Sequence, residues 1–286
     1  MGTCIFTVIK NEQEYLDEFI RYHISIGIDH IFVTEDYGSA SHKEIINKYS
    51  SDKVTLLSVL DLYDTEERKQ RIIYEKTHLF KMQGNYLRNG LAYINNNYQY
   101  DWCFVIDVDE YITFDNRYKG INAVMNEFNE YDAVLLEWKN YGANGLVYKP
   151  NYQERGIIDT YTKIGGFQRS DDCSWFQKVK TVYNMNTYNN TFKSDHLPKS
   201  DCKWCKTDFS QNKETMIYNR MYLRHYITKS FEEYVTKLKI RGMFHPKHRG
   251  YDSFFDMNQD MLDKKEELIQ LANEMIEKYN TKKEIS

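Results

Sequence analysis

Three acidic residues follow a short apolar run near the middle of this 286-residue chain. Phe104, Val105, Ile106 and Val108 favour burial, whereas Asp107, Asp109 and Glu110 do not. Side chains alternate along an extended segment, so we expect Asp107 and Asp109 to share one face, while Glu110 points the other way and supports the loop. Two carboxylates at the end of a buried strand suit a hard divalent cation such as Mg²⁺ or Mn²⁺. An ordinary acidic turn is the alternative, and the triplet alone does not decide between the two.

Polar residues also end two earlier apolar runs. Asn11 and Glu12 follow the first run, and Asp36 ends the second. Parallel strands bring their carboxyl ends to one edge of a sheet, and ligands of open α/β sheets bind there. We therefore expect these three residues to lie at the same crevice as Asp107 and Asp109. Helix capping by Glu12 and turn formation by Asp36 are the structural alternatives.

The pattern of apolar residues predicts the elements that position these side chains. Short β-rich runs predict strands at residues 3–9, 29–36, 54–60, 101–112 and 132–138. Apolar residues at three- and four-residue spacing predict helices between them, at residues 13–27, 41–49, 68–97 and 121–129. This alternation favours an α/β fold of Rossmann-like type, with a mostly parallel central sheet and helices on both faces.

The second half of the chain is less regular. Residues 179–183 and 216–225 have the composition of strands, which indicates an antiparallel extension of the sheet. Ser230 followed by Glu233 is a capping-box pattern and predicts the start of a helix. Residues 254–279 predict a last amphipathic helix.

Composition and charge exclude several classes of protein. The chain has 38 basic and 42 acidic residues and a net charge of −4, whereas nucleic-acid-binding proteins usually carry a basic excess. It has no run of about eighteen apolar residues that would form a transmembrane helix, and no signal peptide is recognisable at its start. Five cysteines, an odd number in a long chain, argue against a disulfide framework. We expect a cytoplasmic protein, either free or peripheral to the cytoplasmic face of the membrane, that binds no nucleic acid.

An ordered set of short motifs resembles glycosyltransferases of GT-A fold, of the family 2-like and family 92-like kinds. The motifs are, in order, Lys10-Asn11-Glu12, Tyr22-His23 with Gly27, Asp107-Val108-Asp109-Glu110-Tyr111, Trp138 with Tyr141-Gly142-Ala143-Asn144-Gly145, and His225-Tyr226 with Lys229-Ser230. The resemblance implies a GT-A domain over residues 1–242, with the antiparallel extension on its acceptor side. Residues 243–286 would then form a C-terminal basic loop and an amphipathic helix that packs on this domain.

This resemblance implies a metal-dependent transfer of a sugar from a nucleotide diphosphate sugar to a glycan or a lipid-linked glycan, and we expect a UDP-sugar as the donor. In such enzymes a divalent ion on the diphosphate stabilises the charge of the leaving group without proton transfer. Asp109 would bind Mn²⁺ or Mg²⁺ directly, and Asp107 would serve both the metal and the nucleotide sugar. His225 would complete the metal site; the alternative is a partly buried histidine that bonds a carbonyl group.

The resemblance also implies contacts with the donor. Such contacts are implied for Asn11, Glu12, Asp36, Gln83 and Arg88. Lys229 belongs to a basic region that would close over a diphosphate, and a solvated basic loop is its alternative.

An inverting enzyme of this kind needs a carboxylate base for the acceptor hydroxyl group. Asp172 is the first candidate, and Asp171 and Glu137 are the others. The sequence Gly165-Gly166-Phe167 ahead of the two aspartates is similar to a Gly-Gly-Phe and acid-acid segment of family 2 enzymes, with a longer spacing here.

Three functions remain open from the sequence alone. The first is an inverting glycosyltransferase of hexosyltransferase type in bacterial surface polysaccharide synthesis. The second is a nucleotidyltransferase, which would normally carry a glycine-rich basic loop after its first strand, and Lys10-Asn11-Glu12 is not such a loop. The third is a nucleotide- or carbohydrate-binding module without catalysis, against which the intact Asp107, Asp109 and His225 argue.

Overall fold

The computed structural model describes residues 1–36, 41–58, 60, 62, 79–165, 179–188, 191–212, 216, 218–240 and 250–285. At residues 79–83, 239–240 and 282–285 it describes the backbone alone. The chain separates into two compact units, Met1–Trp138 with Asp172–Arg224 and Lys139–Asp171 with His225–Ser286. The domain boundary predicted between residues 242 and 243 falls outside the described residues.

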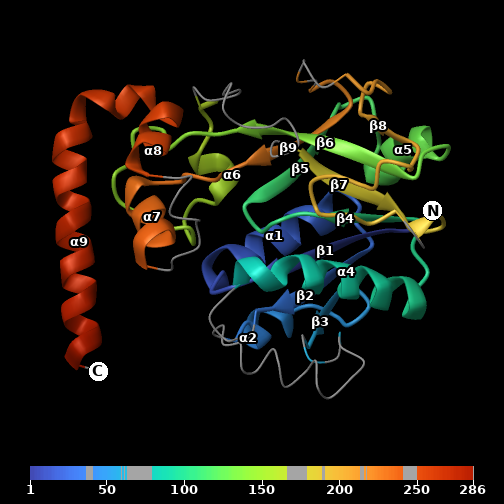
Figure 1. Ribbon diagram of the computed structural model, residues 1–286, viewed down its shortest axis with the longest axis horizontal. Helices are drawn as coiled ribbons and strands as arrows, with labels where there is room; N and C mark the ends of the chain where they lie inside the picture. Colours follow the sequence, from blue (N-terminus) through green and yellow to red (C-terminus); the bar gives the residue numbers. More distant parts are fainter. Residues whose placement is uncertain are drawn as a thin grey trace. The chain divides into compact units, whose positions relative to one another are not determined.

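Four parallel strands form one half of the sheet (Figure 1). They are β1 (Thr3–Ile9), β2 (His30–Glu35), β3 (Val54–Leu57) and β4 (Trp102–Val105), in the spatial order β3-β2-β1-β4. The residues of β1, β2 and β4 are almost all buried, as expected for β-branched and aromatic runs that are covered on both faces. Because the strands are parallel, their carboxyl ends lie at one edge of the sheet.

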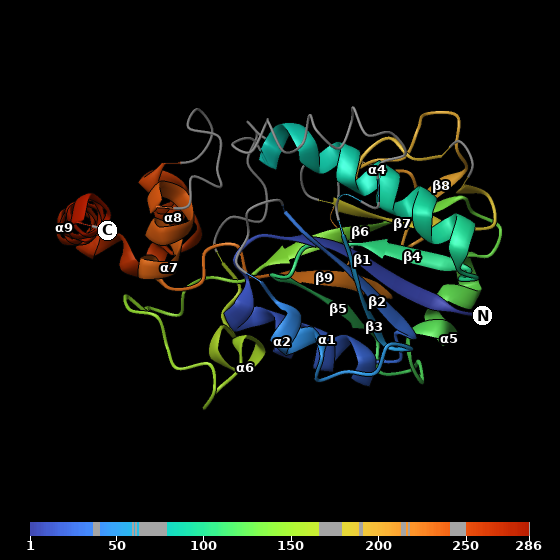
Figure 2. The ribbon, with the colours of Figure 1, turned by 90° about the horizontal axis from the view of Figure 1, so that it is seen from below.

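Helices cover both faces of these strands (Figure 2). α1 (Gln13–Ser25) and α2 (Lys43–Ile46) lie on one face, and α4 (Leu79–Asn97) lies on the other. Gly90 lets α4 approach β1 closely, because a Cβ atom at this position would lie 2.1 Å from the ring of Phe6. The predicted α/β architecture, a mostly parallel sheet with helices on both faces, is therefore confirmed.

Antiparallel strands extend the sheet beyond β4. β7 (Val179–Asn184) pairs antiparallel with β4 on one side and with β6 (Ala133–Asn140) on the other. The order then continues with β9 (Met221–His225) and β5 (Glu110–Phe114), while β8 (Trp204–Lys206) pairs in parallel with β6. After β5 come α5 (Ile121–Met125) and a 3-10 turn (Asn126–Phe128). β7 and β9 confirm the two strands predicted for the extension, although β9 begins only at Met221.

The predicted strand at residues 101–112 is two elements. β4 ends at Val105, and Glu110 begins β5, which lies at the opposite end of the strand order from β3. The acids end β4 because a desolvated, unpaired carboxylate is costly inside a sheet. Asp107 and Asp109 therefore lie in the turn between the two strands, and the prediction that they share a face by strand alternation is wrong.

The second unit is mainly helical. It contains α6 (Ile157–Thr160), α7 (Phe231–Val235), a π-helical turn (Thr236–Ile240), α8 (Tyr251–Met257), a 3-10 segment (Gln259–Lys264) and α9 (Lys265–Ile285). Ser230 and Glu233 form the predicted capping box at the start of α7. The last helix predicted at residues 254–279 is instead α8 and α9 with the 3-10 segment between them.

One apolar cluster holds α7, α8 and α9 together. It includes Phe231 of α7, Phe254 of α8 and Leu268 of α9, all of them buried. Among the described residues, no helix combines the length and the apolar character that crossing a membrane requires.

Candidate functional site

The turn after β4 is held by hydrogen bonds of its own residues. The backbone N–H of Glu110 donates to the carbonyl of Asp107 at 3.0 Å, and the N–H of Asp107 donates to Glu110 Oε2 at 2.9 Å. Glu110 is fully buried and supports the loop, as the sequence predicts. The turn contains both Asp107 and Asp109, so these two bonds fix the backbone that carries the candidate ligands.

Helix α1 anchors the strand that follows this turn. The hydroxyl group of Tyr22 donates to the carbonyl of Ile112 at 2.6 Å, and the N–H of Ile112 donates to His23 Nε2 at 3.3 Å. His23 Nε2 accepts here, so Nδ1 carries the proton and donates to the carbonyl of Phe19 at 2.8 Å. Burial lowers the pKa of His23 to about 3, which keeps the ring neutral. The Tyr22-His23 motif thus ties the first helix to β5.

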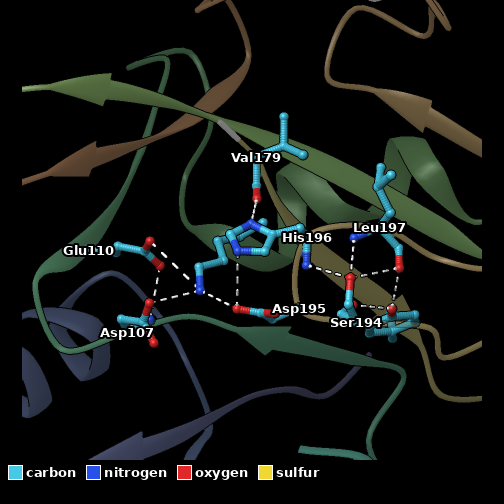
Figure 3. A network of polar contacts seen from close by, with 9 residues as sticks. Asp107, Glu110, Val179, Ser194, Asp195, His196 and Leu197 are labelled. Atoms are coloured by element: carbon cyan, nitrogen blue, oxygen red, sulfur yellow. Dashed lines mark hydrogen bonds and ion pairs between the residues drawn. The ribbon is translucent and has the colours of Figure 1, made fainter. Parts of the chain in front are cut away.

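A buried lysine from β7, Lys180, reaches the same turn. Its Nζ lies 2.8 Å from Asp107 Oδ2, 2.5 Å from Asp195 Oδ2 and 4.0 Å from Glu110 Oε1. Figure 3 shows these three carboxyl groups turned toward one another. β7 runs antiparallel to β4, with Val182 opposite Phe104, so the start of β7 lies beside the carboxyl end of β4. This pairing brings Lys180 to Asp107 across 73 residues of sequence.

The charges of this network favour an ionised lysine. Burial alone would lower the pKa of Lys180, but the carboxyl groups of Asp107, Asp195 and Glu110 outweigh burial and raise this pKa well above its usual range. Burial acts to raise the pKa of Asp195, yet the charges of Lys180 and His196 lower it to about 2. Burial raises the pKa of Glu110 well above its ordinary value. A single ammonium group thus offsets part of the negative charge around the turn.

The turn keeps ligand atoms for a cation. The side chain of Asp107 is 40% exposed, and its Oδ1 makes no hydrogen bond or ion pair with another described residue. Asp109 is buried in the same turn. Within the described ranges, no group of three or more His, Cys, Asp and Glu side chains is arranged to hold a metal ion. Carboxylate oxygens are ligands of the kind that a hard divalent ion takes, together with oxygen atoms of phosphate and water.

His225 and Lys229 belong to the second unit. His225 is buried, and its Nδ1 lies 3.1 Å from Asn140 Oδ1. An amide oxygen accepts, so Nδ1 of His225 carries a proton and donates to it. Lys229 is buried as well and has a left-handed backbone, with φ 49°. The metal role of His225 and the donor contact of Lys229 stay predictions.

A second polar cluster lies at the carboxyl ends of β1 and β2. Lys10 Nζ lies 3.0 Å from Asp36 Oδ2. The N–H of Glu12 donates to His42 Nε2 at 2.9 Å, so His42 carries its proton on Nδ1, which donates to Glu35 Oε1 at 2.9 Å. These contacts tie the loop after β1 to the end of β2.

Asn11 and Glu12 lie in this loop. Asn11 has a left-handed backbone, with φ 55°. Glu12 occupies the N-cap position of α1, but its side chain makes no capping hydrogen bond, so capping does not account for this residue. The nucleotide contacts expected of Asn11, Glu12 and Asp36 stay predictions.

Four further predicted residues are described in part or not at all. Gln83 lies in α4, and its side chain is outside the described residues. Arg88 is exposed on α4, with its guanidinium carbon 5.9 Å from the centre of the Phe192 ring. Asp171 and Asp172 lie outside the described residues.

Glu137, the remaining candidate base, lies in a buried ion pair. Its Oε1 is 2.7 Å from Lys206 Nζ, and both side chains are fully buried or nearly so. Lys206 comes from β8, whose parallel pairing with β6 brings it beside Glu137. The carboxyl group of Glu137 is therefore already engaged by the ammonium group of Lys206.

Sequence reasoning missed Lys180, Asp195 and His42. Lys180 places a charge inside the apolar run of residues 179–183, and this is the one signal in the sequence that points to it. Asp195 and His42 lie in irregular segments, where no spacing marks them.

A family model described as glycosyltransferase family 92 matches residues 1–284 of the chain. Among curated proteins, no match is found. Among solved structures, the chain is similar to HddC from Yersinia pseudotuberculosis, with 8% sequence identity and a TM-score of 0.38, over 72% of this chain and 89% of that one. The similarity to HddC is too low to support an argument, whereas the family match extends over nearly the whole chain.

Proposed function

The chain belongs to glycosyltransferase family 92, and we propose that it transfers a sugar from a UDP-sugar to a hydroxyl group of a glycan or lipid-linked glycan, with Mn²⁺ or Mg²⁺ as cofactor. The family supports the glycosyltransferase class as a whole. The turn of Asp107 and Asp109 carries the finer proposal. It offers two carboxylates on a backbone that is fixed by hydrogen bonds, beside the carboxyl ends of parallel strands.

Asp107 and Asp109 would hold the divalent ion, and the metal role that the motif resemblance implies for His225 stays a prediction. When bound, the ion supplies positive charge that stabilises the leaving nucleotide diphosphate. We assign Asp109 as the direct ligand. Asp107 is the more exposed of the two acids, so we assign it to the ion and to the nucleotide sugar together.

The loop after β1 and the end of β2 would bind the nucleotide. Asn11 and Glu12 follow β1, which neighbours β4 in the sheet. Asp36 follows β2, which lies on the other side of β1 from β4. The bonds through His42 hold this loop in place before a ligand arrives. Gln83, Arg88 and Lys229 are proposed as further contacts with the donor.

The proposed reaction inverts the anomeric carbon. The oxygen of the acceptor hydroxyl group forms the new bond to this carbon while the bond from the carbon to the diphosphate oxygen breaks. A carboxylate takes the proton of the hydroxyl group, and we assign this role to Asp172, with Asp171 as the next candidate. Glu137 is the weakest candidate because it is buried in an ion pair with Lys206.

The wider setting is proposed from the resemblance of the motifs to family 2-like and family 92-like enzymes. It comprises a GT-A fold, transfer of a hexose, a role in bacterial surface polysaccharide synthesis, and action in the cytoplasm or at the cytoplasmic face of the membrane. The order of the motifs supports these points.

Thermal unfolding in the presence of nucleotide diphosphates tests the proposal. The protein is melted with UDP, GDP or TDP, each with and without Mn²⁺. A ligand at one hundred times its Kd stabilises a protein by about 2.7 kcal/mol, so binding raises Tm measurably. We expect a shift with UDP that requires Mn²⁺, and no metal-dependent shift with any diphosphate would contradict the proposal. A binding module without catalysis would show the shift but would not turn over a donor.

A further inference from the structure

Lys180 links the candidate metal-binding turn to a second carboxylate. Its ammonium group lies 2.8 Å from Asp107 Oδ2 and 2.5 Å from Asp195 Oδ2, and its side chain is only 2% exposed. All these residues lie in the first unit of the chain. The two aspartates therefore share one buried cation.

Asp107 is fixed at two points. Its backbone N–H donates to Glu110 Oε2 at 2.9 Å, and its Oδ2 accepts from Lys180. With Oδ2 occupied, Oδ1 is the carboxylate oxygen that remains for a ligand. The contact with Lys180 thus selects both the side-chain conformation of Asp107 and the oxygen that it offers.

Lys180 is itself held on a rigid support. The segment of Asp195 and His196 bonds to β7 on both sides of the lysine. The N–H of Thr181 donates to the carbonyl of Asp195 at 2.7 Å, and His196 Nδ1 donates to the carbonyl of Val179 at 2.8 Å. A side chain that is buried and supported in this way transmits its position to the group that it bonds.

We propose that Lys180 is a positioning residue of the donor site, which holds Asp107 with Oδ1 directed to the divalent ion and the nucleotide. This inference rests on the proposed metal-dependent function. Groups that support metal ligands from behind change metal affinity by about 10- to 100-fold when they are removed.

Simple electrostatics predicts the opposite change in Mn²⁺ affinity when Lys180 is removed. A positive charge next to the site repels a cation, so its removal alone would tighten the binding of Mn²⁺. The sign of the change in affinity therefore separates positioning by Lys180 from its charge.

The test is the binding of Mn²⁺ to the full chain in the presence of UDP, measured by the electron paramagnetic resonance signal of free Mn²⁺ well below the Tm of each variant. Lys206→Met is the matched control for Lys180→Met, since Lys206 is also a buried lysine of the first unit, with Glu137 instead of Asp107 as its ion-pair partner. We expect Lys180→Met to weaken binding by about 10- to 100-fold and Lys206→Met to change it by less than about twofold.

Lys180→Arg covers the case in which Lys180→Met does not fold. It keeps the positive charge but displaces the donor atoms, so it should weaken Mn²⁺ binding to a smaller extent. Unchanged or tighter Mn²⁺ binding in folded Lys180→Met overturns the inference. If only Lys180→Arg folds, unchanged Mn²⁺ binding in that variant overturns it. An equal loss of Mn²⁺ binding in Lys206→Met overturns it as well. If the wild-type protein binds no Mn²⁺ with UDP, the proposed function fails too; if it binds and the Lys180 variants bind equally well, only the role of Lys180 fails.

Discussion

Two lysine–aspartate pairs stand at the carboxyl ends of parallel strands, and they are built differently. Lys10 lies 3.0 Å from Asp36, and Lys180 lies 2.8 Å from Asp107. Lys10 follows β1 directly and its side chain is 24% exposed, whereas Lys180 comes from the antiparallel strand β7 and is buried. The first is an ion pair at the border of the solvent, and the second is part of a network with three carboxyl groups.

This difference concerns how firmly each cluster is held. Water reaches the ammonium group of Lys10 and screens its charge, although Asp36 itself is only 5% exposed. A buried ammonium group is costly without carboxylate partners, and a buried carboxylate is costly without the ammonium group. We infer that the cluster of β1 and β2 can adjust to a nucleotide, whereas buried charge fixes the turn after β4 before a ligand binds.

Lys180→Met should have the largest effect on stability. It leaves Asp195 and Glu110 in a buried setting without the ammonium group, and breaking a buried pair in this way costs about 3–5 kcal/mol of the free energy of unfolding. Unfolding in urea measures this loss. A loss below about 1 kcal/mol, which is the range of surface ion pairs, would contradict the contrast between the two clusters.

The pair of Lys206 and Glu137 serves as a comparison for the Lys180 network, because it is a single buried ion pair. Lys206→Met alone should also cost about 3–5 kcal/mol, and the double variant with Glu137→Met should regain most of this, because two apolar side chains can replace a buried ion pair. Lys180→Met combined with Asp107→Asn should regain little, since Asp195 remains without its cation. Double-mutant cycles in urea compare the two cases, and equal recovery in both would mean that Lys180 forms a simple pair.

The low pKa of Asp195, about 2, makes the stability of the network depend on acid pH. This value lies below the unfolded value of about 3.9, so the contribution is present above about pH 4 and is lost as the pH falls through about 2. Between pH 4 and pH 2, the wild-type protein should lose about 2 kcal/mol more than Asp195→Asn. Urea unfolding over this pH range checks the difference, and parallel curves for the two proteins would contradict it.

Lys10→Met should have the smallest effect. Its ammonium group is partly exposed but Asp36 is only 5% exposed, so the free energy of unfolding should fall by about 1–3 kcal/mol. A loss in urea as large as that of Lys180→Met would show that this cluster is held as firmly as the turn after β4.

Sequence reasoning succeeds where a contact is local to the end of a strand. Asp36 and Asp107 each end an apolar run, and parallel pairing brings such ends to one edge of the sheet. Lys180 is different because its place depends on the insertion of β7 between β4 and β6, which no local pattern encodes. The charge inside the run of residues 179–183 marks Lys180, but the sequence does not show whether this side chain faces solvent or buried carboxylates.

The helices of the second unit show the same limit. The capping box of Ser230 and Glu233 is local and is found where the sequence predicts it. The break between α8 and α9 lies inside one amphipathic pattern and is not predicted. Asn258 ends α8, and its Oδ1 accepts from the N–H of Ala143 at 2.5 Å, a contact across 115 residues that a helical repeat does not reveal.

Release of UDP from a UDP-sugar tests the central claim most directly. The protein is incubated with UDP-glucose, UDP-galactose or UDP-N-acetylglucosamine, with Mn²⁺ or after its removal by EDTA, and wild type is compared with Asp109→Ala and with the exposed control Asp115→Ala. We expect the wild-type protein and the control to release UDP from at least one donor only with Mn²⁺, and Asp109→Ala to be slower by about 100-fold or more, since a bound ion supplies several kcal/mol of charge stabilisation. Equal rates for Asp109→Ala and the wild-type protein, or a wild-type rate that EDTA leaves unchanged, would contradict a metal-dependent glycosyltransferase with Asp109 at its centre.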